Sequence, residues 1–147
     1  MSGLYAETSA VLAWLLGESN SAVALSAMND SERVLTSVLT ELEVRRSLIR
    51  AHSGGTLTEA TAVQLMGRFE TVSRAWVIME LTPEIRARAA MRFPVEPIRS
   101  LEAIHLATAL EFLRAVQDLR ILSFDRRVAD NIEPLGMRRA PAVPGES

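Results

Sequence analysis

The apolar positions of this chain alternate between short runs typical of strands and longer runs with the period of an amphipathic helix. The expected strands cover residues 4–7, 34–36, 76–79, 120–124 and 137–139. The expected helices cover residues 9–17, 22–28, 37–51, 56–73, 83–92 and 126–135, and one more begins at Ser100. Thr56 and Glu59 have the spacing of a capping box, and Ser100 is a residue type that commonly caps a helix.

Short strands that alternate with helices predict an α/β fold, in which helices cover both faces of a short, mostly parallel sheet. The chain has no internal repeat, so we expect one domain over residues 1–140 and a flexible tail over residues 141–147. Ligands of parallel sheets bind at the carboxyl ends of the strands. Glu7 and Asp125 both lie at such ends, so the pattern predicts a site there.

Composition narrows the possible chemistry of that site. Hydrophobic residues make up 48% of the 147 residues, which excludes extensive disorder. No apolar run reaches the roughly 18 residues of a membrane span and no secretory signal is visible, so we expect no membrane association and a cytoplasmic protein. The sequence has no cysteine, which excludes disulfides and thiolate chemistry, and His52 and His105 lie far apart in sequence. A bound metal would therefore have oxygen ligands, which favours Mg²⁺ or Mn²⁺.

The positive charge of the chain comes from arginine alone. The sequence contains 16 cationic side chains and no lysine, at a net charge of −2. A GC-rich coding sequence is the favoured explanation of this composition. The planar guanidinium group nevertheless suits phosphate, because it can donate two parallel hydrogen bonds.

Four acidic residues are candidate metal ligands, and each has a structural alternative. Glu7 precedes a helix, Asp125 precedes the last helix, and Glu102 stands in the first turn of the helix from Ser100. A carboxylate at a helix N-terminus is stabilised by free N–H groups and by the helix dipole without any metal. These three residues are therefore either helix caps or ligands.

Glu43 poses a different question. It lies roughly 200° around its helix from Glu41, which is placed to pair with Arg45. Glu43 faces the less polar side and needs a partner, for which a metal ion and an arginine are equal candidates. His105, one turn after Glu102, is expected to be a hydrogen-bonded packing residue rather than a ligand.

Taken together, the four acids favour a metal site. Clustered carboxylates repel one another unless cations or bound protons relieve them. Mg²⁺ or Mn²⁺ bound there could generate hydroxide and stabilise charge on a phosphodiester. Arg46, Arg99, Arg126 and Arg127 lie near these acids in sequence and are candidates for phosphate contacts.

Four segments resemble the motifs of the PIN-domain ribonucleases, and within them the VapC-type toxins of toxin–antitoxin pairs. They are Tyr5-Ala-Glu-Thr-Ser-Ala10, Thr40–Leu48, Arg99-Ser-Leu-Glu-Ala-Ile-His-Leu-Ala-Thr-Ala-Leu110 and Leu122-Ser-Phe-Asp-Arg-Arg127. The resemblance implies a three-layer α/β/α domain that cleaves RNA endonucleolytically with Mg²⁺ or Mn²⁺. It further implies Glu7, Glu43, Glu102 and Asp125 as site residues, Ser9 as a partner of a carboxylate or phosphate, a homodimer, and an antitoxin as binding partner.

The chain departs from the family pattern at two site positions, where Glu7 and Glu102 stand in place of aspartate. Each change adds one methylene and keeps the charge, which bears on catalytic efficiency more than on fold. One alternative is therefore a weakened PIN-fold protein that binds RNA or a peptide without efficient cleavage. Another is an interaction domain whose acids are only caps and salt bridges. Trp14, Leu15 and Leu57–Phe69 could line a groove for an antitoxin helix, with ordinary core packing as the alternative.

Overall fold

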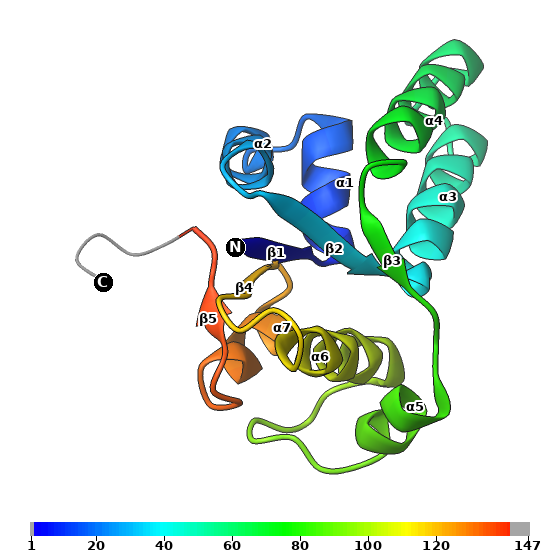
Figure 1. The fold of residues 1–147 in the computed structure, drawn as a ribbon. Coiled ribbons are helices and arrows are strands. Elements are labelled where there is room, and N and C mark those ends of the chain that lie inside the picture. Colours follow the sequence, from blue (N-terminus) through cyan, green and yellow to red (C-terminus); the bar gives the residue numbers. More distant parts are fainter. Residues whose placement is uncertain (1, 142–147) are drawn as a thin grey trace.

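A five-stranded parallel sheet forms the middle layer of the protein (Figure 1). The computed structural model describes residues 2–141. The strands are β1 (Gly3–Ala6), β2 (Arg33–Ser37), β3 (Val77–Met79), β4 (Arg120–Leu122) and β5 (Arg138–Arg139). Their order is β3-β2-β1-β4-β5, and every neighbouring pair is parallel. The predicted α/β class with a short parallel sheet is confirmed.

Helices cover both faces of this sheet. They are α1 (Thr8–Leu16), α2 (Ser21–Asn29), α3 (Val38–Ser53), α4 (Glu59–Ser73), α5 (Pro83–Ala89), α6 (Ser100–Leu113) and α7 (Arg126–Ile132). Figure 1 shows α1 to α4 on one side and α5 to α7 on the other. The architecture is therefore the expected three-layer α/β/α sandwich.

Alternation along the strands divides the buried residues into two cores. In β1, Leu4 and Ala6 pack with the apolar faces of α1 to α4, whereas Tyr5 packs with α6 and α7. In β4, Leu122 joins the first core and Ile121 the second. Side chains that follow one another in a strand point to opposite faces, and both faces here are covered. We call these two clusters the α1–α4 core and the α6–α7 core.

One predicted helix start and one predicted helix cap are wrong, for local reasons. The N-terminal cap of α4 is Thr58, whose hydroxyl accepts from the backbone N–H of Thr61, and not Thr56. Thr56 and Leu57 instead donate to the carbonyl of Ala51 and so complete the last turn of α3.

At α6 the cap is Arg99, in extended conformation, and Ser100 is the first helical residue. Glu102 reaches back to the Arg99 N–H, so the cap lies one residue before the predicted Ser100. Smaller differences occur at other ends. Glu7 lies just after β1, β4 ends at Leu122, α5 ends at Ala89 and α7 ends at Ile132.

The proposed antitoxin groove is mostly core in this structure. Leu15, Leu65 and Phe69 are buried in the α1–α4 core, and Trp14 packs against Trp76 with ring centroids 6.4 Å apart. The packing alternative therefore describes Trp14, Leu15, Leu65 and Phe69. Its exposed side contributes Val63 and Met66 to a hollow of about 300 Å³ between α3 and α4.

Within the described residues, no single helix has the length and apolarity needed to cross a membrane. Of the described helices, only α1 and α2 together have that length and apolarity, and the two helices are bent by 112° at their junction. Of the expected flexible tail, residues 142–147 lie outside the described part of the chain.

Candidate active site

Helices from both outer layers begin beside the carboxyl edge of the sheet. α1 follows β1, α3 follows β2, and α7 follows β4 after a short loop, while α6 starts close to α7. Strand order reverses around β1, so this edge is where a parallel sheet offers a ligand site. Free N–H groups and positive dipole ends of the helices favour carboxylates there.

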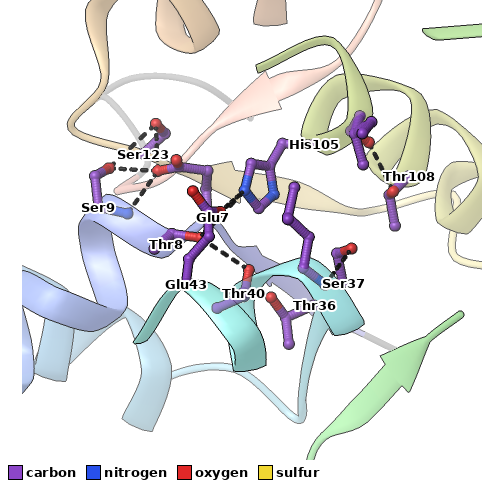
Figure 2. A network of polar contacts seen from close by, with 12 residues as sticks. Glu7, Thr8, Ser9, Thr36, Ser37, Thr40, Glu43, His105, Thr108 and Ser123 are labelled. Atoms are coloured by element: carbon purple, nitrogen blue, oxygen red, sulfur yellow. Dashed lines mark hydrogen bonds and ion pairs between the residues drawn. The ribbon is translucent and has the colours of Figure 1, made fainter. Parts of the chain in front are cut away.

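Glu7 is the most deeply buried of the four predicted acids, with 4% of its surface exposed. It caps α1, and its Oε2 accepts from the backbone N–H of Ser9 at 2.9 Å, from the Ser9 hydroxyl, and from Ser123 Oγ at 3.0 Å (Figure 2). Burial raises the pKa of Glu7, although the His105 imidazole and these hydrogen bonds act in the opposite direction.

Glu43 reaches the same region from α3. Its Oε1 accepts from the Thr8 hydroxyl at 2.7 Å and lies 2.8 Å from His105 Nε2 (Figure 2). Burial alone would raise the pKa of Glu43, but the contacts with His105 and Thr8 outweigh it and hold the pKa below its ordinary value. Its partners are thus a histidine and a threonine, whereas sequence reasoning proposed a metal or an arginine. The predicted partner of Glu41, Arg45, pairs with Glu70 of α4 at 3.0 Å.

Glu102 occupies the first turn of α6, as predicted. Its Oε2 accepts from the backbone N–H of Arg99 at 2.5 Å, which makes it a capping residue. Its Oε1 lies 3.9 Å from the guanidinium group of Arg127.

Asp125 caps α7, and its Oδ1 accepts from the backbone N–H groups of Arg127 at 2.9 Å and Val128 at 3.4 Å. For both Glu102 and Asp125, the capping alternative raised by the sequence is therefore observed. Capping does not exclude a second role, because it uses one oxygen of each carboxylate.

All four acids line one cleft of about 340 Å³. Its lining residues are Glu7, Glu43, Arg99, Ser100, Leu101, Glu102, His105 and Asp125. The hydrogen bonds described for Glu7, Glu43 and Asp125 are made to a single oxygen of each carboxylate, which leaves the second oxygen available to the cleft.

This donor set suits a hard divalent cation. Within residues 2–141, however, no three His, Asp or Glu side chains are arranged to hold one metal ion directly. Mg²⁺ is commonly held through one or two carboxylates while it keeps several waters. The residues present therefore fit an ion bound by one or two carboxylates directly and by the others through water.

The predicted phosphate-contact residues have different surroundings. Ser9 is committed to structure, since its hydroxyl contacts Glu7 and accepts from the Phe124 N–H at 2.8 Å. Arg99 lines the cleft. Arg126 is 92% exposed at the start of α7, 3.7 Å from Asp130, and Arg46 is exposed on α3. A role of these residues in RNA binding stays a prediction.

Three residues support the acids: sequence reasoning missed Thr8 and Ser123, and it expected His105 to be a hydrogen-bonded packing residue without identifying its partners. Thr8 and His105 hold Glu43, and Ser123 holds Glu7. Each lies next to a recognised motif or inside it. His105 follows Glu102 by one helical turn, and Thr8 follows Glu7 directly. That spacing places His105 and Thr8 close to the site. It does not predict the contact between His105 and Glu43, because these residues are 62 positions apart and meet only in the folded protein.

The largest hollow among those described lies elsewhere. It measures about 700 Å³ and is lined by the start of β1, by α2 and by residues around β5. Its lining includes Asp30 and Asp118 but none of the four predicted acids. The four predicted acids therefore line a smaller cleft than this hollow.

Comparison with known proteins agrees with this geometry. The family model of the PIN domain matches residues 4–133. Ribonuclease VapC49 of Mycobacterium tuberculosis is 30% identical over 141 residues, which cover 95% of each protein. Ribonuclease VapC35 of the same species is 29% identical over 146 residues, or 98% of each protein.

Two solved structures share the fold. VapC20 of Mycobacterium tuberculosis, a toxin that cleaves the sarcin-ricin loop, has a TM-score of 0.60 at 15% identity and covers 88% of this chain and 97% of its own. VapBC2 of Rickettsia felis, bound to a DNA fragment from its promoter, has a TM-score of 0.57 at 6% identity, with coverages of 89% and 93%. From the family model and the relatives together, the chain belongs to the PIN-domain family and is of the VapC type.

Proposed function

We propose that this protein is an endoribonuclease that depends on Mg²⁺ or Mn²⁺ and acts as the toxin of a toxin–antitoxin pair. The observation that carries this proposal is the single cleft into which β1, α3, α6 and the loop after β4 bring four carboxylates. The curated relatives, which are named as ribonucleases, support the reaction class.

Glu7, Glu43, Glu102 and Asp125 would hold the ion between them, directly or through water. Once bound, the ion would lower the pKa of water and stabilise negative charge on a phosphodiester. Glu43 is suited to this task because its pKa is lowered, so that it stays ionised at neutral pH. Ser9 and Ser123 orient Glu7, and Arg99 lies in the cleft wall where it can bind a phosphate of the RNA.

The partners follow from the family. The VapBC2 structure places a protein of this fold in an assembly on promoter DNA, which supports an antitoxin as partner. The proposal also includes a homodimer and action in the cytoplasm, where RNA is available.

The test is a manganese titration followed by calorimetry. Glu43→Gln keeps the size of the side chain and an acceptor for His105 and Thr8, but removes the charge. We expect the wild type to bind Mn²⁺ and Glu43→Gln to lose both binding and Mn²⁺-dependent RNA cleavage. Glu41→Gln is the matched control, because Glu41 lies on the same helix outside the cleft and its removal should leave both unchanged.

A folded wild type that binds RNA, but neither binds Mn²⁺ nor cleaves, would refute the proposal. That result would favour the alternative of a weakened binding protein. Cleavage that persists in Glu43→Gln would remove Glu43 from the site.

A further inference from the structure

A chain of polar contacts runs from the sheet to the cleft beneath the four acids. The Tyr5 hydroxyl lies 2.8 Å from His105 Nδ1, and His105 Nε2 lies 2.8 Å from Glu43 Oε1. Tyr5 and His105 are 0% and 2% exposed, so water cannot replace these contacts. Figure 2 shows the His105 imidazole beside Glu7 and Glu43, with a dashed line that joins its ring to Glu43.

The chemistry of the two ends sets the direction of these hydrogen bonds. An ionised carboxylate accepts hydrogen bonds and cannot donate them, so His105 has to donate to Glu43 through Nε2–H. In a neutral imidazole the other nitrogen is then an acceptor, and the Tyr5 O–H is the donor it faces.

We propose that Tyr5 and His105 are positioning residues, which fix the Glu43 carboxylate so that one oxygen is held from below and the other faces the cleft. Tyr5 selects the nitrogen of His105 that carries the proton, and His105 acts with Thr8 on Glu43 Oε1. This inference rests on the proposed metal-dependent function, and it assigns the task of orienting a ligand to Tyr5 and His105.

The placement of the pair follows from two elements that already supply acids. Tyr5 precedes Glu7 by two residues, so alternation in the extended segment directs both toward α6. His105 follows Glu102 by three residues, which places both on one side of α6. Each of these segments therefore contributes one acid to the cleft and one supporting residue beneath it.

The alternative is that His105 and Tyr5 only fill the α6–α7 core and satisfy each other. Replacing a supporting partner of a metal ligand commonly costs roughly 10- to 100-fold in metal affinity or activity. A packing role predicts a loss of stability with any replacement. A positioning role predicts that the outcome depends on whether the new side chain carries an N–H at the place of Nε2.

The first measurement uses the metal-free wild type labelled with ¹⁵N-histidine. Long-range ¹H–¹⁵N correlation spectra report which ring nitrogen is protonated, and His52→Asn assigns the two histidines. We expect His105 to show a bare Nδ1 and a protonated Nε2, and Tyr5→Phe to populate the form with Nδ1–H. A protonated Nδ1 in the wild type would overturn the proposal.

The second measurement is the manganese affinity of His105→Gln and His105→Leu. Glutamine carries an N–H about as far from the backbone as imidazole Nε2, whereas leucine fills space without a donor. We expect His105→Leu to weaken Mn²⁺ binding at least tenfold and His105→Gln to stay within about threefold of the wild type. His52→Gln, at an exposed histidine outside the cleft, should leave the affinity unchanged.

The outcomes separate the two hypotheses. A wild type that binds no Mn²⁺ refutes the proposed function, and this role with it. A wild type that binds Mn²⁺, with His105→Gln and His105→Leu equally affected or equally unaffected, refutes only the positioning role. If His105→Leu does not fold, Tyr5→Phe takes its place. That variant removes one oxygen, and unchanged Mn²⁺ affinity in it would refute the role of Tyr5.

Discussion

Glu7 and Glu43 have the same side chain, but the protein shifts their pKa values in opposite directions. Glu7 is buried more completely, and burial dominates over the three hydrogen bonds to its Oε2. Glu43 is partly exposed at the cleft, and the donors His105 and Thr8 outweigh its burial. As the pH rises, Glu43 therefore loses its proton before Glu7 does.

The raised pKa of Glu7 predicts a pH-dependent gain in stability for Glu7→Gln. The pKa of Glu7 is higher in the folded protein than in the unfolded protein. The stability that comes from the protonated carboxyl group is therefore present at acid pH and is lost as the pH rises through the pKa of the folded state. Glutamine does not ionise and avoids this loss. We expect Glu7→Gln to raise Tm near neutral pH by about 2–4 °C in the presence of chelator. At a pH equal to the ordinary pKa of glutamate, the substitution should change Tm little.

Thermal unfolding over a series of pH values checks this prediction. Glu18→Gln, at an exposed glutamate after α1, is the control and should change Tm little at every pH. A neutral-pH Tm of Glu7→Gln below that of the wild type would show that the hydrogen bonds to the charged form outweigh burial.

At the scale of elements, the candidate site consists of helix N-termini. Glu7 and Asp125 cap α1 and α7, and Glu102 closes the first turn of α6. The N–H groups that stabilise these helices also fix the orientation of the carboxylates. The capping role and the ligand role can therefore coexist in one side chain, and substitutions can separate them.

Asp125 allows this separation. Asparagine caps helices about as well as aspartate but carries no charge, whereas alanine lacks the acceptor. We expect the free energy of unfolding of Asp125→Asn to stay within about 0.5 kcal/mol of the wild type and that of Asp125→Ala to fall by about 1 kcal/mol. Both variants should bind Mn²⁺ more weakly. Urea unfolding and manganese titration measure the two effects, and full Mn²⁺ affinity in Asp125→Asn would reduce Asp125 to a cap.

The elements show which features the sequence could predict. Periodicity located the strands and helices, and the acids expected at strand ends line one cleft in the structure. The start of α4 was missed because the C-terminal turn of α3 takes up Thr56. His105 was recognised as a hydrogen-bonded residue, but its partner was not. Helical spacing reports neighbours on the same helix, whereas the contact between His105 of α6 and Glu43 of α3 depends on how the sheet brings these two helices together.

At the scale of the molecule, the cleft lies where the two helical layers meet. α1 and α3 come from one layer, α6 and α7 from the other, and the central strand β1 ends between them. The net charge of −2 would not attract RNA, so the local distribution of the 16 cationic side chains has to do so. Arg99 in the cleft, and Arg126 and Arg127 at the start of α7, provide positive charge next to the acids.

Arg126 is the best place to test this distribution, because its side chain is almost fully exposed and its surface ion pair contributes little to stability. If it contacts one phosphate, Arg126→Gln should reduce the salt slope of single-stranded RNA binding by about 0.7. Arg114→Gln, beyond the far end of α6 and about 20 Å from its start, is the control. Fluorescence anisotropy in the Glu43→Gln background measures binding without cleavage. An unchanged slope would show that Arg126 does not contact a phosphate of the RNA.

The sheet ends on both sides in very short strands, β3 with three residues and β5 with two. A long unpaired edge strand is a template on which other chains can add a strand and aggregate. These edges expose too few consecutive backbone groups to act in that way. Association by addition of a strand is therefore disfavoured at both edges, which leaves side-chain surfaces on the helices for contacts with other proteins.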